Sequence, residues 1–294
     1  MASRRTRVCS ARQAGFPLLV SRDATRLMSS TTAAPSPTQK KQVKYFHEPG
    51  WDVESGHYDS RYFQGKVPYE DHRPVLRHLI RSYLTAFREI GAETWLAHGS
   101  LLGWWWNGHI MPWDYDLDVQ VSVATLRFLS ERYNQSIHEY NTKIKKTYLL
   151  DINPHYDDMT KGNGANIIDA RWIDTSNGMF IDITGLRERD LEHSPGVWSC
   201  KNNHRYRTTE LWPLRRTEFE GVEAWIPYAF DKVLVDEYGP RCLVVTEWAG
   251  HRWNPELREW IKVPKPPKKE KQTRPSKIDS HGNLVVYEEV IVEA

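Results

Sequence analysis

The chain has 294 residues, with 40 Lys and Arg against 38 Asp and Glu, a net charge of +2 and a mean hydropathy of −0.65. This balance gives no support for a nucleic-acid-binding surface, and no apolar run reaches the roughly 18 residues of a transmembrane helix. Three cysteines form no evident metal set and at most one bridge in the folded part, so they leave the redox compartment open.

Composition divides the chain into three parts. Residues 1–43 carry arginines among Ser, Thr and Ala, which resembles a mitochondrial transit peptide; a disordered leader without a targeting role is the alternative. Residues 44–263 have the size of one folded domain. Residues 264–294 begin rich in Pro and Lys, so we expect a basic, disordered tail.

Apolar residues recur at three- and four-residue spacing over 71–90, which predicts a helix capped by Asp71, with Pro74 in its first turn and Gly91 at its end. We expect this helix to pack on a sheet and to carry no chemistry. The later elements, in chain order, are expected as a strand at 94–97, a short helix at 101–106, a turn at 107–108, a strand at 110–122, a helix at 124–133, strands at 147–152, 165–173 and 179–184, a hairpin at 211–227 turning at 220–221, and a helix at 229–238.

Three acids, Asp114, Asp116 and Asp118, occupy alternate positions of the strand expected at 110–122. Alternate residues of a strand share one face, so the three carboxylates would point the same way. Like charges on one face repel and lose hydration, whereas a divalent cation would compensate both costs. Carboxylate oxygens suit Mg²⁺ or Mn²⁺, so the pattern predicts a metal site; a solvated acidic edge strand is the alternative.

Two further acids lie within apolar strand segments, where a carboxylate needs a partner. Asp182 could pair with an arginine or a backbone amide, or it could be a third metal-facing carboxylate from a neighbouring strand. Asp169 is expected to pair with Arg171 or another cation. Gly99-Ser100 ends a short apolar run and is expected to let a phosphate approach the backbone, with both amides and the Ser100 hydroxyl holding it.

Several histidines and tryptophans have two open interpretations. His98, His204 and His251 could contact a substrate, but a structural role is the default, and Arg252 has no assigned role. The tryptophans at 104–106 and 113 could stack on a sugar or a base, with core packing as the default for at least two of them.

One motif combination resembles a known family. H-G-S-L-L-G at 98–103, followed by H-I-M-P-W-D-Y-D-L-D-V at 109–119, resembles the signature of the LicD family. The resemblance continues with F-I-D-I at 180–183, the hairpin sequence P-L-R-R-T-E-F-E-G-V at 213–222 and F-D-K-V-L-V-D-E-Y-G at 230–239, and it spans residues 70–255. This chain has Ser100 where Thr is commoner, three consecutive tryptophans at 104–106, and no cysteine-rich zinc insertion.

The resemblance implies an α+β, nucleotidyltransferase-like fold, in which helices flank a mixed β-sheet. The family includes bacterial phosphocholine transferases, fukutin and fukutin-related protein, and fungal proteins linked to mannosylphosphate transfer. We therefore expect a metal-dependent phosphotransferase that moves a phospho-alcohol or phospho-sugar from a nucleotide-diphosphate donor to a hydroxyl of a glycan or glycoprotein. A non-catalytic regulator or glycan-binding partner of such an enzyme is the alternative.

The resemblance also implies roles for the acids. Asp116 and Asp118 would hold Mg²⁺ or Mn²⁺ against the pyrophosphate, and Asp182 would complete the metal site or accept the proton of the attacking hydroxyl. Asp114 would bind metal or fix the turn after Pro112.

Two cations and the compartment complete the expectations. Lys161 and Arg171 are candidates for the donor diphosphate, with structural pairing as an equal alternative for Arg171. Glycan modification implies the secretory pathway, whereas the leader composition is mitochondrial-like, and the single glycosylation sequon at Asn134 can arise by chance.

Overall fold

A computed structural model of the chain describes residues 43–264, apart from Trp51, Val53, 142–144 and 159–164, together with Lys277–Ile278 and Leu284–Val285. The expected leader lies outside the described residues apart from position 43, as does most of the expected tail. The chain groups into two compact units, Met1–Val245 and Thr246–Ala294.

The first unit is built on a mixed, eight-stranded sheet. Its strands are β1 (Trp95–Leu96), β2 (Asp118–Ser122), β3 (Ser136–Asn141), β4 (Lys145–Ile152), β5 (Ala170–Asp174), β6 (Phe180–Glu188), β7 (Val197–Ser199) and β8 (Arg205–Arg207). The main order is β1-β2-β6-β5-β4-β3, and β7 and β8 continue from the end of β6. The β2–β6 pair is parallel, and the other pairs are antiparallel.

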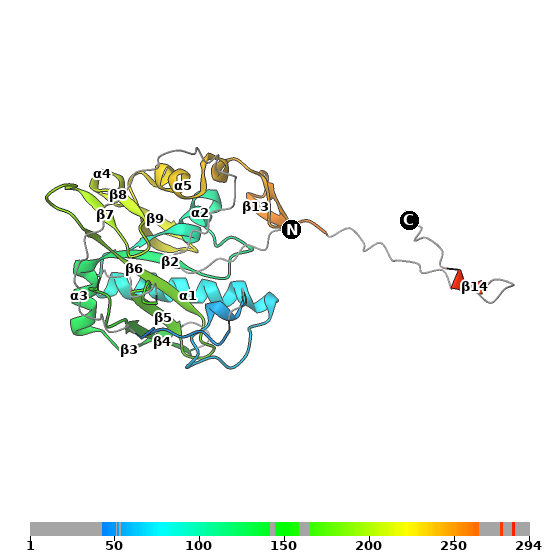
Figure 1. Ribbon diagram of the computed structural model, residues 1–294, viewed down its shortest axis with the longest axis horizontal. Coiled ribbons are helices and arrows are strands. Elements are labelled where there is room, and N and C mark those ends of the chain that lie inside the picture. The colour runs from blue at the N-terminus through cyan, green and yellow to red at the C-terminus, as the bar shows by residue number, and fades with distance from the viewer. Residues whose placement is uncertain are drawn as a thin grey trace, which may run out of the picture. The chain divides into compact units, whose positions relative to one another are not determined.

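Helices and one hairpin flank this sheet (Figure 1). They are the short 3₁₀ helix η1 (Ser55–His57), α1 (Tyr69–Glu89), α2 (His98–Asn107), α3 (Val123–Arg132), α4 (Thr208–Leu211), the hairpin β9 (Arg215–Phe219) and β10 (Val222–Ile226), α5 (Phe230–Tyr238), and the 3₁₀ helix η3 (Pro240–Leu243). In Figure 1, α1 runs along the sheet, whereas α2, α5 and β9 gather beyond β2. The α+β fold, with helices flanking a mixed sheet, is thereby confirmed.

The second unit contains a three-stranded antiparallel sheet of β11 (Glu247–Trp248), β12 (His251–Asn254) and β13 (Glu259–Lys262). Further along, β14 (Lys277–Ile278) pairs with β15 (Leu284–Val285). Among the described residues, no helix combines the length and apolar character needed to cross a membrane.

The long helix α1 packs as its periodicity predicts. Leu79, Tyr83 and Phe87 are fully buried, and both aromatic rings meet Trp172 of β5 edge-on, with centroids 6.0 and 6.2 Å away. Burying each such side chain contributes about 1.5–3 kcal/mol. The expected cap at Asp71 is wrong, because the helix begins at Tyr69; Asp71 lies in the first turn, where its charge favours the positive end of the helix dipole.

The expected hairpin forms and is anchored through its turn. Glu220 and Gly221 both have positive φ, 49° and 76°, which is the geometry of a tight two-residue β-turn. The buried Glu220 carboxylate accepts a hydrogen bond from the Ile110 amide at 2.8 Å and pairs with Arg77 of α1 at 3.2 Å. The turn therefore holds together α1, the hairpin and the segment that follows α2.

Candidate functional site

Two of the predicted site acids lie side by side on the parallel strands β2 and β6. Asp118 and Asp182 are register partners, and they are 7% and 1% exposed. Asp118 Oδ1 and Asp182 Oδ2 have no hydrogen-bond partner among the described residues. Buried carboxylate oxygens without a partner are costly to keep ionised, so this pair opposes its own charged state.

The same crowding raises the pKa of both carboxyls. Burial raises the pKa of Asp182 to about 7, although the Arg171 guanidinium acts to lower it. Burial, and then the Asp116 charge, raise the pKa of Asp118 well above its ordinary value. A divalent ion would reverse this, because it stabilises the ionised forms.

Asp114 and Asp116 reach the site from a loop. The strand expected at 110–122 forms only over Asp118–Ser122, and residues 110–117 form a loop with a turn at 112–113, where the Asp114 amide donates to Met111 O at 3.0 Å. The argument that three acids share one strand face is therefore wrong. The three acids nevertheless lie close enough to interact, because the Asp116 charge adds to burial in raising the pKa of both Asp114 and Asp118.

The first turn of α2 lies directly behind these acids. A Cβ on Gly99 would stand 3.1 Å from Asp114 Oδ2, so the carboxylate approaches the helix backbone closely there. Ser100 Oγ accepts the Asp118 amide at 3.0 Å and so fixes the start of β2. The structure thus brings Gly99 and Ser100 to the acids, and the Ser100 hydroxyl positions Asp118.

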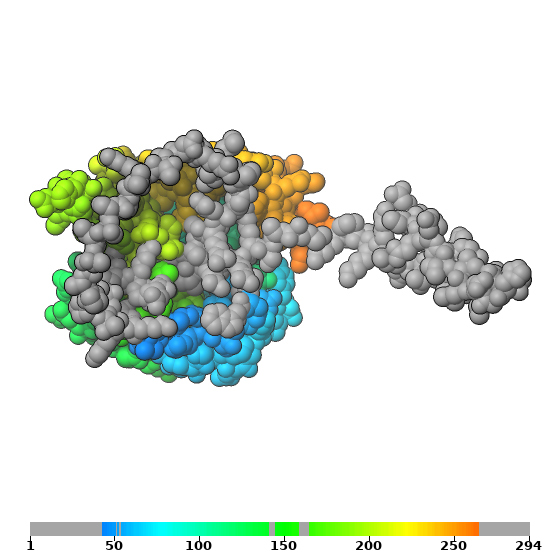
Figure 2. All heavy atoms as spheres, in the orientation of Figure 1, coloured from blue at the N-terminus to red at the C-terminus, as the bar shows by residue number. Residues whose placement is uncertain are grey.

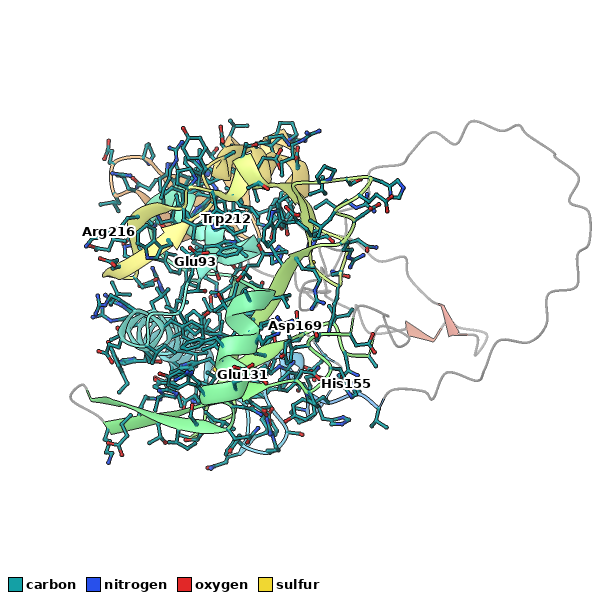
Figure 3. The ribbon with its side chains drawn as sticks, turned by 90° about the vertical axis from the view of Figure 1, so that its left-hand side faces the viewer. Glu93, Glu131, His155, Asp169, Trp212 and Arg216 are labelled. Carbon is teal, nitrogen blue, oxygen red and sulfur yellow. The ribbon has the colours of Figure 1, made fainter. Side chains whose placement is uncertain are left out.

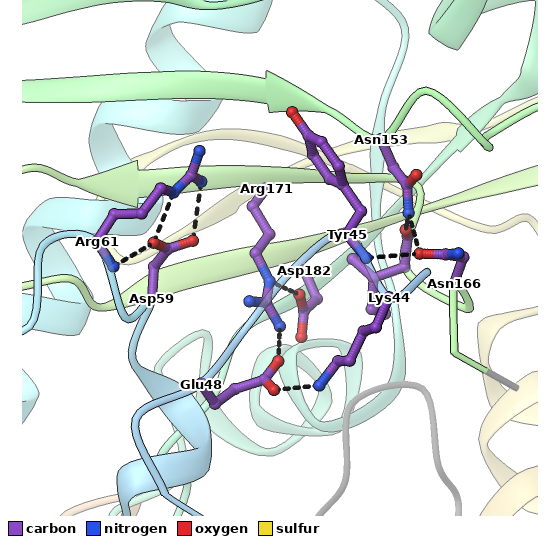
Figure 4. Close-up of polar contacts among 10 residues, drawn as sticks. Lys44, Tyr45, Glu48, Asp59, Arg61, Asn153, Asn166, Arg171 and Asp182 are labelled. Carbon is purple, nitrogen blue, oxygen red and sulfur yellow. Dashed lines mark hydrogen bonds and ion pairs between the residues drawn. The ribbon is translucent and has the colours of Figure 1, made fainter. Parts of the chain in front are cut away.

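Arg171 is committed to structural pairing (Figure 4). Its Nε donates to Asp182 Oδ1 at 2.9 Å and its Nη2 to Glu48 Oε1 at 2.7 Å. The guanidinium also stacks 3.6 Å from the Phe180 ring centroid and 4.7 Å from that of Phe46. It is 1% exposed. Of the two alternatives for Arg171, the structure supplies the pairing with an acid.

Of the other two charged candidates, Asp169 forms an ion pair of its own. Lys161 lies outside the described residues. Asp169 pairs with Lys201, whose Nζ lies 2.9 Å from Asp169 Oδ1 and donates to His155 O at 2.6 Å. Asp169 and His155 are both labelled in Figure 3. The expected pairing of Asp169 with a cation is confirmed, and the cation is Lys201.

His57 is a site residue that the sequence analysis missed. It is 3% exposed, and both ring nitrogens lack a hydrogen-bond partner among the described residues. Burial lowers its pKa, and the charges acting on it come chiefly from Asp116, Arg171 and Glu48. Figure 2 shows this N-terminal part of the domain, in blue, beside the cyan residues of α1. A lone histidine in a turn-rich segment has no periodic signal, so only the folded chain places it here.

A second cluster lies next to the acids. His98 Nδ1 and Glu237 Oε1 are 2.6 Å apart, and the His98 and His204 ring centroids are 4.6 Å apart. Burial alone would lower the pKa of His98, but the Glu237 carboxylate raises it to about 9. Burial and the neighbouring His98 charge lower the pKa of His204 to about 4.

The remaining aromatic and histidine candidates pack or pair locally. Trp104 Nε1 donates to Thr217 Oγ1 at 2.8 Å and Trp106 Nε1 to Cys242 O at 3.2 Å, in agreement with core packing. In the second unit, His251 Nδ1 lies 3.0 Å from Ala249 O. Arg252 pairs there with Glu247 at 2.8 Å.

Comparison with known proteins agrees with the fold and the motifs. Residues 91–229 match the family model described as LicD/FKTN/FKRP, nucleotidyltransferase domain. Two similar proteins of Saccharomyces cerevisiae, Mannosyltransferase regulator 4 and Mannosyltransferase regulator 14, are each 37% identical over 153 and 155 residues. The aligned segment is 49% of this chain but only 13% and 16% of those proteins. The resemblance inferred from the motifs is confirmed: the chain carries a LicD-family nucleotidyltransferase domain at residues 91–229.

Proposed function

We propose that this domain transfers a phospho-alcohol or phospho-sugar from a nucleotide-diphosphate donor to a hydroxyl of a glycan or glycoprotein. One observation carries the proposal: Asp118 and Asp182 are buried side by side, and each has a carboxylate oxygen without a partner among the described residues. Two buried carboxylates add little to core packing and lose their hydration, whereas they are suitable ligands for a divalent ion that also binds phosphate oxygens.

The chemistry of the acids fits Mg²⁺ or Mn²⁺. Asp116 and Asp118 would hold the ion, with Asp182 beside them and Asp114 as a further oxygen ligand. All four are carboxylates, which are the hard donors these ions prefer. The bound ion would supply charge neutralisation of the donor pyrophosphate, and the residues around it would supply positioning.

The transfer itself needs an acceptor for one proton. The hydroxyl oxygen of the glycan forms a bond to the transferred phosphorus, the pyrophosphate P–O bond breaks, and a nucleoside monophosphate leaves. His57 is suited to take the hydroxyl proton, because burial lowers its pKa and so keeps the ring neutral, and because neither ring nitrogen has a hydrogen-bond partner within the described structure. Asp182 is the alternative proton acceptor, although Arg171 already donates to its Oδ1.

Contacts with the donor phosphates form a separate part of the proposal. The amides of Gly99 and Ser100 lie in the first turn of α2, where backbone N–H groups and the helix dipole favour an anion. Lys161 stays a candidate cation. Arg171 would act indirectly, because its charge supports the ionised form of Asp182.

A non-catalytic regulator is the second candidate function. The observation that favours it is the printed name of both yeast relatives, which calls them regulators of a mannosyltransferase. Those names also support a glycan-related role for this chain under either candidate. The two candidates differ in one measurable property, because a regulator does not need metal-dependent binding of a nucleotide-linked donor.

The discriminating experiment is calorimetry of the full chain with Mn²⁺ and a panel of CDP- and GDP-linked donors, followed by turnover assays with the donor that binds. The transferase proposal expects donor binding that requires Mn²⁺ or Mg²⁺. It also expects Asp116→Ala and Asp118→Asn to abolish turnover, while Asp190→Asn, an exposed acid paired with His193, leaves it unchanged. Active Asp118→Asn protein would contradict the metal site, and absence of metal-dependent donor binding would favour the regulator.

A further inference from the structure

Three metal-ligating side chains from separate elements meet beside the acids. His98 is the first residue of α2, His204 lies between β7 and β8, and Glu237 lies in the last turn of α5. Each offers one ligand atom, and these three atoms lie within 4.8 Å of one another. Residues 98, 204 and 237 are far apart in the sequence, so the fold alone assembles the group.

We propose that His98, His204 and Glu237 bind one transition-metal ion of the zinc type. Two imidazole nitrogens and one carboxylate oxygen are a donor set that proteins use for zinc, with a fourth coordination position open to water or a substrate oxygen. Imidazole ligands favour zinc and its neighbours over Mg²⁺. The ligand chemistry therefore separates this site from the all-carboxylate site of Asp116 and Asp118.

His204 is held in place by groups that are not themselves in the triad. Its Nδ1 lies 3.4 Å from the Sγ of Cys200, which is fully buried. The Cys200 amide donates to His204 O at 3.3 Å, and the Asn203 amide donates to Cys200 O at 3.2 Å, so residues 200–204 form a tight loop. A ligating histidine commonly has its other ring nitrogen engaged in this way, which orients the ring before the metal binds.

The side chains of His98 and Glu237 are buried, and their ligand atoms already lie close together. Their side chains are 5% and 6% exposed, and Nδ1 and Oε1 are 2.6 Å apart, which is the distance of a hydrogen bond with one proton between them. A metal ion replaces that proton, and the two ligand atoms then separate to either side of the ion. Metal binding should therefore release a proton, as it does generally when a histidine becomes a ligand.

The site is adjacent to the acids without sharing their residues. Asp118 and Gln120 are two residues apart on β2 and so lie on the same face of the strand. The Gln120 side chain reaches the cluster, with its Nε2 3.5 Å from His98 Nε2. The proposal does not depend on transferase activity, because a regulator could bind this ion equally well.

The test is a zinc titration of the full chain, freed of metal by a chelator, in competition with a chromophoric zinc indicator. We expect one tight equivalent of Zn²⁺ in the wild type. His204→Gln should weaken it by about 100-fold or more, since even residues that only orient ligands are worth 10- to 100-fold. His193→Gln is the matched control, because His193 is 75% exposed and pairs only with Asp190 among the described residues.

A second readout guards against misfolded variants. Co²⁺ replacing Zn²⁺ should give the visible absorption of a low-coordinate nitrogen and oxygen site in the wild type and in Asp118→Asn, and not in His204→Gln. Circular dichroism should report the same fold for all three proteins. Absence of stoichiometric Zn²⁺ binding by the wild type, or unchanged binding in His204→Gln, would overturn the proposal. Mn²⁺-dependent donor binding that survives such a result would leave the transferase proposal standing.

Discussion

Asp118 of β2 and Asp182 of β6 are register partners on neighbouring parallel strands. Each has a carboxylate oxygen without a hydrogen-bond partner among the described residues. Their arrangement costs stability in the metal-free protein, because burial, and then nearby negative charges that include Asp116, oppose ionisation of both groups.

Removing one of these charges should therefore stabilise the metal-free fold. We expect Asp118→Asn to raise the free energy of unfolding in EDTA by about 1 kcal/mol, which corresponds to a rise of roughly 2–4 °C in Tm for a domain of this size. The same variant should lose the Tm increase that Mn²⁺ gives the wild type. Differential scanning calorimetry with and without Mn²⁺ measures both effects. A lower Tm in EDTA would mean that Asp118 is a structural acid.

His57 should matter for turnover more than for folding. If its unpaired nitrogen accepts the hydroxyl proton, His57→Gln should lower kcat by about 10²- to 10⁴-fold. Binding of Mn²⁺ and donor should change little, because neither requires the imidazole. Steady-state kinetics and calorimetry on the same preparation give both numbers. His78→Gln, on the exposed face of α1, is the control, and a kcat near the wild-type value would remove His57 from the proposal.

Arg171 should behave as a structural residue. Arg171→Met leaves Asp182 and Glu48 without their shared cation, and we expect a loss of about 3–5 kcal/mol in the free energy of unfolding. Arg171→Lys keeps the charge but loses the two-sided donation and the stacking on Phe180, so its loss should be smaller. Urea unfolding curves rank the two variants. Equal losses would show that planarity of the guanidinium, and not its charge, dominates.

The Asp169 carboxyl should make stability depend on pH. Burial raises its pKa from 3.8 to about 6, although Lys201 acts to lower it. The folded protein therefore keeps this proton at pH values where the unfolded chain has lost it. The contribution is fully present below the unfolded pKa and is lost as pH rises through about 6. Relative to Asp169→Asn, the wild type should be more stable at pH 4.5 than at pH 7, as measured by urea unfolding at both values; no difference would contradict the raised pKa.

Gly103 should be the least replaceable glycine of α2. A Cβ at this position would lie 2.4 Å from the backbone oxygen of His109, which cannot move without shifting the loop that carries the acids. We expect Gly103→Ala to cost about 1–3 kcal/mol. Gly56→Ala is the control, because a Cβ there meets nothing within 4 Å. Thermal unfolding compares the Tm values of the two variants, and we expect the lower value for Gly103→Ala. Equal Tm values would contradict the close packing at Gly103.

Features encoded by neighbouring residues could be predicted. The helix at α1 follows from apolar spacing, the hairpin from its Glu220-Gly221 turn, and the family from contiguous motifs at 98–119 and 213–239. In each case the determining interactions lie within a turn or two of the chain, where periodicity and turn chemistry act.

Features that depend on contacts between distant segments could not be predicted from the sequence. The sequence suggested a strand over 110–122, but packing of the loop against α2 shortens it to Asp118–Ser122 and turns Asp114 and Asp116 out of the strand. The register that sets Asp118 beside Asp182, the choice of Glu48 as a second partner for Arg171, and the meeting of His98 with Glu237 all depend on how the sheet and helices associate. Local sequence patterns do not predict these pairings. The free energy of each pairing comes from burial and charge compensation between residues that are tens to more than a hundred positions apart in the sequence.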